Sequence, residues 1–265
     1  KEKSEIKNEK YATNTSRISA YAIAQDCISS VVKKILNYPV QSYADKWLPL
    51  VMRATIGTAI HDTIQKNSNQ FTETEVSVKV PSIRFSGRLD GLIGNNVLCE
   101  IKSCPYKDYE WIIKNQQPRK SDFYQLMVYK YVIENYLEES KTHNEETRTP
   151  PPKYDNYDFN TLQFIYVAHD MFSSDVDSFS EALAIVKRVK QMLNSRRNDM
   201  FFMTSVVLDT NCFDVAPYMK YIKEKIERIN YYLDNNKIPP ADDPYIDRKK
   251  CFFCLYKDNC EVTKK

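Results

Sequence analysis

Glycine is scarce in this chain of 265 residues, which contains only four. A glycine-rich loop that cradles nucleotide phosphates needs several closely spaced glycines, so the sequence excludes a nucleotide-driven motor on this polypeptide. The four glycines (Gly57, Gly87, Gly91 and Gly94) all lie within one short span. Because glycine serves where backbones approach closely or φ is positive, we expect such close approaches in this span.

Long apolar runs are also missing. No run approaches the ~20 residues that a membrane-spanning helix needs, and the polar start KEKSEIKNEK differs from a secretory signal. We therefore expect a cytoplasmic protein, or a nuclear one if the host is eukaryotic or viral. In such a compartment the seven cysteines indicate metal binding or free thiols rather than disulfides. The net charge of +3 is small, so a polyanion would need a local basic patch.

The glycine-containing span predicts two strands, Arg84–Ile93 and Val97–Lys102, joined by a turn at Gly94. Side chains alternate along a strand. Glu100 and Lys102 are therefore expected on one face, while Cys99 and Ile101 point the other way, into a core. Asp90 lies on the partner strand, where pairing would bring it beside Glu100.

Two carboxylates beside one ammonium form an energetically unfavourable arrangement, because the carboxylates repel one another. A divalent cation would remove that cost, and carboxylate ligands favour Mg²⁺ or Mn²⁺. The alternative is a solvated hairpin with no chemistry. The triplet Glu5-Ile6-Lys7 repeats the Glu-x-Lys pattern in a polar stretch with no strand pattern, which shows that such a triplet arises by chance.

The remaining periodicity predicts one domain over 17–265, preceded by a mobile charged tail at 1–16. The charged, proline-rich stretch 140–158 is expected to be an exposed insertion. After Lys102 we expect a loop whose aromatic and basic residues either stack on nucleic-acid bases or are merely solvated. Helices are predicted from Ser19 to Leu36, at Ala44–Lys66, Ser121–Glu139, Phe179–Asn194 and Ala216–Asn235, and further strands at 72–80, Thr161–Ala168 and Met200–Leu208.

A cysteine cluster lies near the C-terminal end, where Cys251, Cys254 and Cys260 form a C-x2-C-x5-C pattern. This spacing favours three thiolates around one metal centre. The pattern fits both zinc and an iron–sulfur cluster, since each accepts four thiolates. The fourth ligand would be one of the other cysteines: Cys27, Cys99, Cys104 or Cys212.

Six short motifs, taken together in chain order, resemble the RecB-like branch of the PD-(D/E)xK nuclease superfamily. Within that branch they are most similar to the iron–sulfur exonucleases that include the CRISPR-associated RecB-like protein and the AddB nuclease module. The motifs are RISAYAIAQDC with Cys27, GTAIH with His61, GRLD with Asp90, EIK with Glu100 and Lys102, QLMVY with Gln125 and Tyr129, and the cysteine triplet after Pro239-Pro240.

The resemblance implies an α/β fold with a restriction-endonuclease-like core, in which helices flank a mixed sheet. A helical N-terminal part and an iron–sulfur segment at 251–260 would complete it. The implied activity is Mg²⁺- or Mn²⁺-dependent hydrolysis of DNA, as an exonuclease on single-stranded ends. The implied partners are DNA and a recombination, repair or CRISPR-adaptation protein.

The resemblance also implies roles for individual residues. His61, Asp90, Glu100 and the backbone carbonyl of Ile101 would bind the cation, and the nitrogen ligand would favour Mn²⁺ over Mg²⁺. Lys102 would act at the water or the scissile phosphate, with Gln125 and Tyr129 positioning the strand or the lysine. A [4Fe–4S] cluster would be held by Cys27, Cys251, Cys254 and Cys260.

Two other functions are compatible with these residues. One is a module that binds DNA ends or docks on a partner and has lost cleavage. The other is an RNA endonuclease of the cap-snatching type, which uses a similar His–Asp–Glu–Lys set but leaves the cysteine cluster unexplained.

Overall fold

The computed structural model describes residues 17–25, 27–39, 47–147, 158–168, 187, 203–246, 254, 256 and 260. The predicted tail at 1–16 and Cys251 lie outside the described residues, as does the helix predicted over 179–194 apart from Lys187. No helix in the described ranges combines the length and apolar character needed to cross a membrane.

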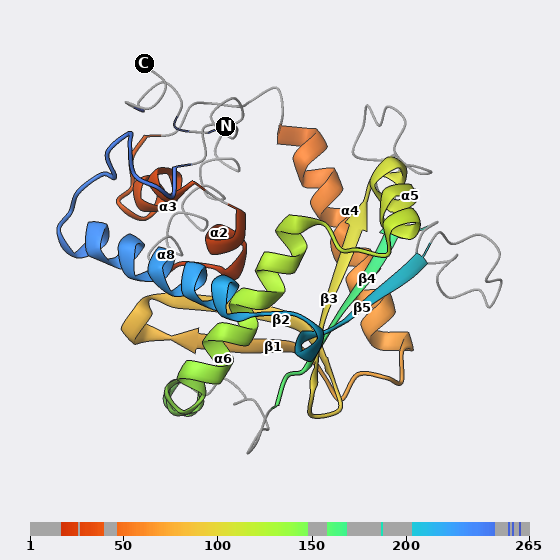
Figure 1. The fold of residues 1–265 in the computed structure, drawn as a ribbon. Helices are drawn as coiled ribbons and strands as arrows, with labels where there is room; N and C mark the ends of the chain where they lie inside the picture. Colours follow the sequence, from red (N-terminus) through yellow and green to blue (C-terminus); the bar gives the residue numbers. More distant parts are fainter. Residues whose placement is uncertain are drawn as a thin grey trace.

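The centre of the fold is a five-stranded sheet with the order β1-β2-β3-β4-β5 (Figure 1). The strands β3 and β4 run parallel, and the other three neighbouring pairs are antiparallel. The bounds are Glu73–Val80 for β1, Phe85–Ile93 for β2, Val97–Cys104 for β3, Thr161–Ala168 for β4 and Met203–Asp209 for β5. The prediction of a mixed sheet is confirmed.

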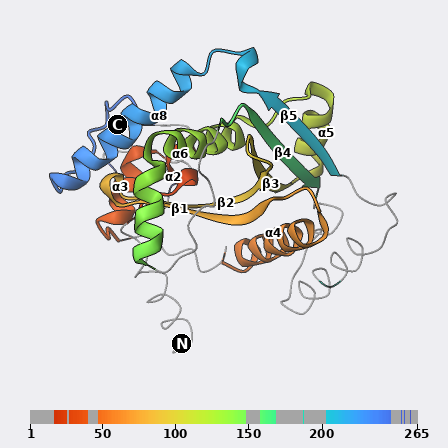
Figure 2. The same cartoon turned by 90° about the horizontal axis from the view of Figure 1, so that it is seen from below.

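Helices cover both faces of this sheet (Figure 2). One face carries α6 (Lys120–Glu146), with α8 (Ala216–Asp234), α2 (Ala20–Gln25) and α3 (Ile28–Ile35) packed around it. The other face is contacted by α4 (Trp47–Asn67), and α5 (Tyr106–Asn115) packs beside β4. Strand β3 contributes to both layers, since Leu98 belongs to the core under α6 whereas Ile101 packs with Ile60 of α4.

The first predicted helix is interrupted. The structure ends α2 at Gln25 and begins α3 at Ile28, with Cys27 in an extended conformation between them. The Cys27 carbonyl accepts hydrogen bonds from the Ser30 hydroxyl and from the backbone N–H groups of Ser30 and Val31. Apolar periodicity could not reveal this break, because Ile23 before it and Val31 after it face the same core.

Two stretches predicted to be irregular are helical. The stretch after Lys102 forms α5 rather than a loop, and it buries Tyr109 and Ile112. Helix α6 kinks at Tyr136 and continues to Glu146, so the first part of the predicted 140–158 insertion is not a loop.

Polar residues explain why the C-terminal end of α6 packs on the sheet. The hydroxyl of Ser140 accepts a hydrogen bond from the Lys79 backbone N–H, and the Asn144 amide donates one to the Ser77 carbonyl. Both side chains are buried against β1. A charged, polar composition therefore did not mean exposure here, because the outer edge of β1 has backbone groups that need partners.

Candidate active site

The candidate site lies where β2 and β3 separate. Their ladder pairs Ile93 with Val97, Leu92 with Leu98 and Gly91 with Cys99, so the next opposed residues in this register are Asp90 and Glu100. The ladder stops before that pair. Instead, Oδ2 of Asp90 accepts a hydrogen bond of 2.7 Å from the backbone N–H of Ile101. The Asp90 carboxylate is thus held on β3 itself.

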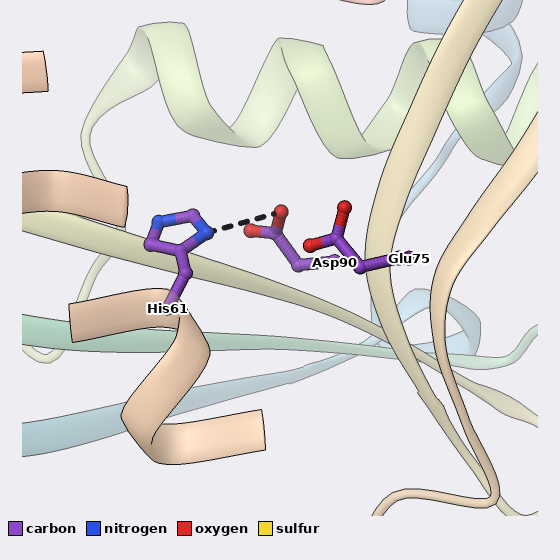
Figure 3. A group of neighbouring side chains, drawn as sticks. All are labelled: His61, Glu75 and Asp90. Atoms are coloured by element: carbon purple, nitrogen blue, oxygen red, sulfur yellow. Dashed lines mark ion pairs between the residues drawn. The ribbon is translucent and has the colours of Figure 1, made fainter. Parts of the chain in front are cut away.

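His61 approaches the same carboxylate from α4 (Figure 3). Its Nδ1 lies 3.3 Å from Oδ1 of Asp90. Burial lowers the pKa of His61, but the hydrogen bond and the negative charge of Asp90 outweigh burial, and the pKa is raised overall. The predicted proximity of His61 and Asp90 is found in the structure.

Glu75 lies beside His61 and Asp90 and is a residue of the site that the sequence reasoning missed. The pairs Thr74–Gly91 and Val76–Leu89 on either side place it opposite Asp90 across β1 and β2, and its φ of 56° is left-handed. One ligand atom from each of His61, Glu75 and Asp90 lies within 4.8 Å of the others (Figure 3). The available signal was the alternation of the 72–80 strand, but only the register shows which carboxylate meets Asp90.

Neighbouring side chains hold both oxygens of Glu75. Gln65 of α4 donates from Nε2 to Oε1 of Glu75 at 2.9 Å and to the Asp90 carbonyl at 2.8 Å. Nε of Arg88 lies 2.5 Å from Oε2 of Glu75. Gln65 therefore links the two strands that supply the carboxylates.

Glu100 points toward α6, where it forms a closed triangle with Lys102 and Gln125. Its Oε1 lies 2.6 Å from Nζ of Lys102 and accepts a 2.6 Å hydrogen bond from Nε2 of Gln125. Lys102 in turn donates to Oε1 of Gln125 at 3.0 Å. Among the described residues nothing hydrogen-bonds Oε2 of Glu100, which is buried. One oxygen of a nearly inaccessible carboxylate is thus left for a further group.

Burial governs the electrostatics of this triangle. It raises the pKa of Glu100 to about 7, against the pull of Lys102, and the charge of Asp90 adds to the rise. Burial lowers the pKa of Lys102, but the charge and hydrogen bond of Glu100 outweigh it, so the pKa is raised. Lys102 is therefore held as an ammonium. Asp90 and Glu100 lie near enough for their charges to interact, although they hold different partners.

A second carboxylate behind Lys102 was also missed. Asp122 of α6 is buried and its charge helps to raise the pKa of Lys102. Its Oδ2 accepts hydrogen bonds from the Tyr166 hydroxyl at 3.0 Å and from Nε of Arg119 at 2.7 Å. Because Tyr166 lies on β4, far from Asp122 in sequence, no local motif indicates this contact.

Tyr129 lies one turn beyond Gln125 and contacts β2. Its hydroxyl donates a 2.8 Å hydrogen bond to the Arg88 carbonyl. The ring passes directly over Gly87, where a Cβ atom would lie only 2.8 Å from the tyrosine Cε1 and hydroxyl oxygen. The G-x-x-D and Q-x-x-x-Y motifs are thus in contact, and glycine is required because the tyrosine fills the space above it.

Three of the predicted cysteine ligands are described, and they come from both ends of the fold. Cys27 precedes α3, and the hydroxyl of Ser29 in the first turn of that helix lies 3.9 Å from Sγ of Cys260. Burial raises the pKa of Cys254, and the charges of Cys27 and Cys260 raise it further. Cys254 is therefore near enough to both Cys27 and Cys260 to be affected by their charges. Cys99 and Cys104 are buried in β3, and Cys212 is exposed.

The predicted ligand set is only partly brought together. His61 and Asp90 are grouped with Glu75, whereas Glu100 is engaged by Lys102 and Gln125. The backbone of Ile101 meets Asp90 through its N–H group. A cation bound jointly by Glu100 and the Ile101 carbonyl stays a prediction.

No family model and no curated protein matches the chain. Among the solved structures that resemble it weakly are three crystal structures. Two are crystal structures of LHK-Exo, an alkaline exonuclease from Laribacter hongkongensis; the complex with dAMP has 15% identity and a TM-score of 0.43, and the other has 14% and 0.40. Each alignment covers 86% of this chain and 95% of that one. The third is SSO0001, with 12% identity, a TM-score of 0.42 and coverage of 94% and 87%. Resemblances this weak carry no information about the chemistry of the site. The arrangement of its side chains is the evidence for that chemistry.

Proposed function

We propose that this chain is a divalent-cation-dependent nuclease that hydrolyses phosphodiester bonds in DNA, acting as an exonuclease on single-stranded ends. The observation that carries the proposal is the juxtaposition of two groups at one fork in the sheet. His61, Glu75 and Asp90 form a compact nitrogen and oxygen donor set. The triangle around Glu100 contains the ammonium of Lys102, whose charge also acts on His61 of this donor set.

The donor set fits Mg²⁺ or Mn²⁺. Carboxylate oxygens are the ligands that both ions prefer, and an imidazole nitrogen shifts the preference toward Mn²⁺. The ion would be held by His61, Glu75 and Asp90. The unpartnered Oε2 of buried Glu100 supports a further oxygen ligand there, and we propose the Ile101 carbonyl as another. When bound, such an ion polarises a phosphoryl oxygen and lowers the pKa of a coordinated water.

The chain's own residues supply the remaining functions. Since Lys102 is held as an ammonium, it would stabilise negative charge that develops on the phosphate rather than remove a proton. Gln125 fixes both Lys102 and Glu100 through its amide. Tyr129 fixes the backbone of β2 two residues before Asp90, so it would act as a positioning residue.

Digestion of end-labelled substrates tests this proposal. Single-stranded DNA, duplex DNA and RNA, each with free or blocked ends, would be incubated with Mn²⁺, Mg²⁺ or EDTA. We expect Mn²⁺-dependent release of nucleotides from free single-stranded DNA ends and none in EDTA. Selective cutting of RNA, or binding of DNA ends without cleavage, would replace the proposal with one of the alternatives.

Single-residue variants distinguish cleavage by this site from cleavage by a contaminating nuclease. Lys102→Ala and Asp90→Ala should each reduce the cleavage rate by roughly 10²–10³-fold, the scale for loss of one group that stabilises transition-state charge. Glu5→Ala, in the unrelated Glu-Ile-Lys triplet, should cut at the wild-type rate. Wild-type cleavage by Lys102→Ala would show that the triangle around Glu100 has no part in the reaction.

We further propose that Cys27, Cys251, Cys254 and Cys260 hold a [4Fe–4S] cluster. Support comes from the convergence of three of these thiols from both ends of the fold. Zinc held by the same four thiolates is the alternative, since both zinc and an iron–sulfur cluster accept four thiolates.

Such a cluster would join two ends of the chain. Closing so long a loop stabilises the fold by roughly 4–5 kcal/mol, by analogy with a disulfide. Anaerobically purified protein should be brown with about four iron atoms per chain. Cys254→Ala should lose the colour and melt early, whereas Cys212→Ala should keep both colour and stability. Stoichiometric zinc without iron would refute the cluster.

A further inference from the structure

Arg88 occupies a position in the site that the proposed reaction does not explain. It lies on β2 two residues before Asp90, so both side chains leave the strand on the same side. Its Nε is 2.5 Å from Oε2 of Glu75, yet 70% of its side chain is exposed to solvent. Arg88 thus pairs with a member of the cation-binding group from the solvent side.

A divalent cation would compete with this ion pair. Any cation held by His61, Glu75 and Asp90 would coordinate an oxygen of Glu75, and these oxygens already have Gln65 and Arg88 as partners. Because each carboxylate oxygen has two lone pairs, the competition is between positive charges rather than for a vacant position. Gln65 is neutral and is also anchored on the Asp90 carbonyl, so it can stay. The guanidinium is positively charged and would be repelled by a neighbouring cation. Arg88 is therefore the partner whose ion pair with Glu75 the cation weakens.

We infer that Arg88 is a substrate-binding residue, which the divalent cation releases from Glu75 so that it can pair with a phosphate of the nucleic-acid strand. The planar guanidinium matches phosphate oxygens with two parallel hydrogen bonds. The Arg88 carbonyl is held by Tyr129, so the side chain moves while the backbone stays in place. This inference rests on the proposed nuclease function, and it adds the residue that couples the cation to the substrate.

The coupling between Arg88 and the cation is unfavourable without DNA and favourable with DNA, and the two effects can be measured separately. Without DNA, Arg88 opposes the cation because the two compete for Glu75. With DNA, the cation favours binding because it frees the guanidinium, and by linkage DNA favours the cation to the same extent. A residue that only adds positive charge to the surface would strengthen DNA binding equally with or without the cation.

Arg88→Gln in the cleavage-defective Lys102→Ala background tests this. The matched control is Lys223→Gln in the same background, since Lys223 is an exposed cation of α8 that also pairs with a carboxylate. Mn²⁺ affinity would be measured by calorimetry without DNA, and the affinity for labelled single-stranded DNA by fluorescence anisotropy in Mn²⁺ and in EDTA, over a range of salt concentrations.

We expect Arg88→Gln to bind Mn²⁺ several-fold more tightly than its parent. In Mn²⁺ it should bind DNA about tenfold more weakly, with the slope of log K against log salt smaller by about 0.7, the value for one phosphate contact on a single strand. In EDTA the two proteins should bind DNA alike, and Lys223→Gln should match the parent throughout. Arg88→Lys, which keeps the charge, should give intermediate DNA affinity and provides the same comparison if Arg88→Gln does not fold.

Equal Mn²⁺ affinity in Arg88→Gln and its parent would overturn the inference, as would an equal loss of DNA affinity in Mn²⁺ and EDTA. If the parent itself bound no Mn²⁺, the proposed cation site would fail and Arg88 with it. The two failures are therefore distinguished by the parent protein alone.

Discussion

Replacement of Gly87 by alanine tests whether the tyrosine of α6 is locked onto β2 as the structure indicates. The new Cβ would lie 2.8 Å from both Cε1 and the hydroxyl oxygen of Tyr129, and 3.1 Å from Cζ of Phe85. Tyr129 is buried and its hydroxyl donates to the Arg88 carbonyl. The ring cannot yield without losing that hydrogen bond.

Two costs combine in this variant. Insertion of a methyl group into a packed site costs about 1–3 kcal/mol, and loss of the tyrosine hydrogen bond costs about 0.5–1.5 kcal/mol. We therefore expect Gly87→Ala to lower the free energy of unfolding by roughly 2–4 kcal/mol. In a domain of this size that corresponds to a fall in Tm of about 5–15 °C.

A double-mutant cycle isolates the contact. Tyr129→Leu removes the two nearest atoms that the new methyl group would meet and leaves only Cζ of Phe85 at 3.1 Å, so Gly87→Ala should cost less than about 1 kcal/mol in that background. Urea unfolding of the four proteins gives the coupling energy, and Tyr129→Phe separately reports the hydrogen bond. An equal cost of Gly87→Ala in both backgrounds would show that Tyr129 does not lie over Gly87.

Three further outcomes are expected. Gln125→Met, which keeps the side-chain volume but breaks both amide hydrogen bonds to Glu100 and Lys102, should lower kcat for cleavage and leave KM nearly unchanged; an unaffected kcat would remove Gln125 from the site. In EDTA, folding raises the pKa of Glu100 from 4.5 to about 7, so the folded state binds the Glu100 proton more tightly than the unfolded state does. The stabilisation from this proton is therefore complete below pH 4.5 and is lost as the pH rises through about 7. Glu100→Gln should lack this part of the pH dependence in urea unfolding, and parallel curves would contradict it. Iodoacetamide at pH 8 should alkylate exposed Cys212 but not Cys99, whose pKa is raised by burial; peptide mapping that found Cys99 modified in folded protein would contradict the burial.

The sequence predicted the parts of the fold that local patterns determine. The strand alternation and the Gly94 turn predicted the β2–β3 hairpin, and the spacing of Gln125 and Tyr129 predicted one shared helix face. Patterns of this kind repeat within a few residues, so they can be recognised in the sequence without knowledge of the tertiary structure.

The missed features depend on register and on long-range partners. Glu75 joins the site only because β1 pairs with β2 in one particular register, and a shift of one residue would put it on the other face. Asp122 matters because Tyr166 and Lys102 lie beside it, and these residues are distant in sequence. The break at Cys27 was missed because the same apolar periodicity continues on both sides of it.

The end of α6 has a consequence for association between molecules. A strand at the border of a sheet exposes backbone donors and acceptors that can template pairing with a strand of another chain. Beyond the kink at Tyr136, α6 covers this border of β1 with Ser140 and Asn144. Two outward-facing backbone groups of β1 are thereby capped by side chains that cannot continue a ladder. The last two turns of this helix thus protect β1 against strand-mediated aggregation.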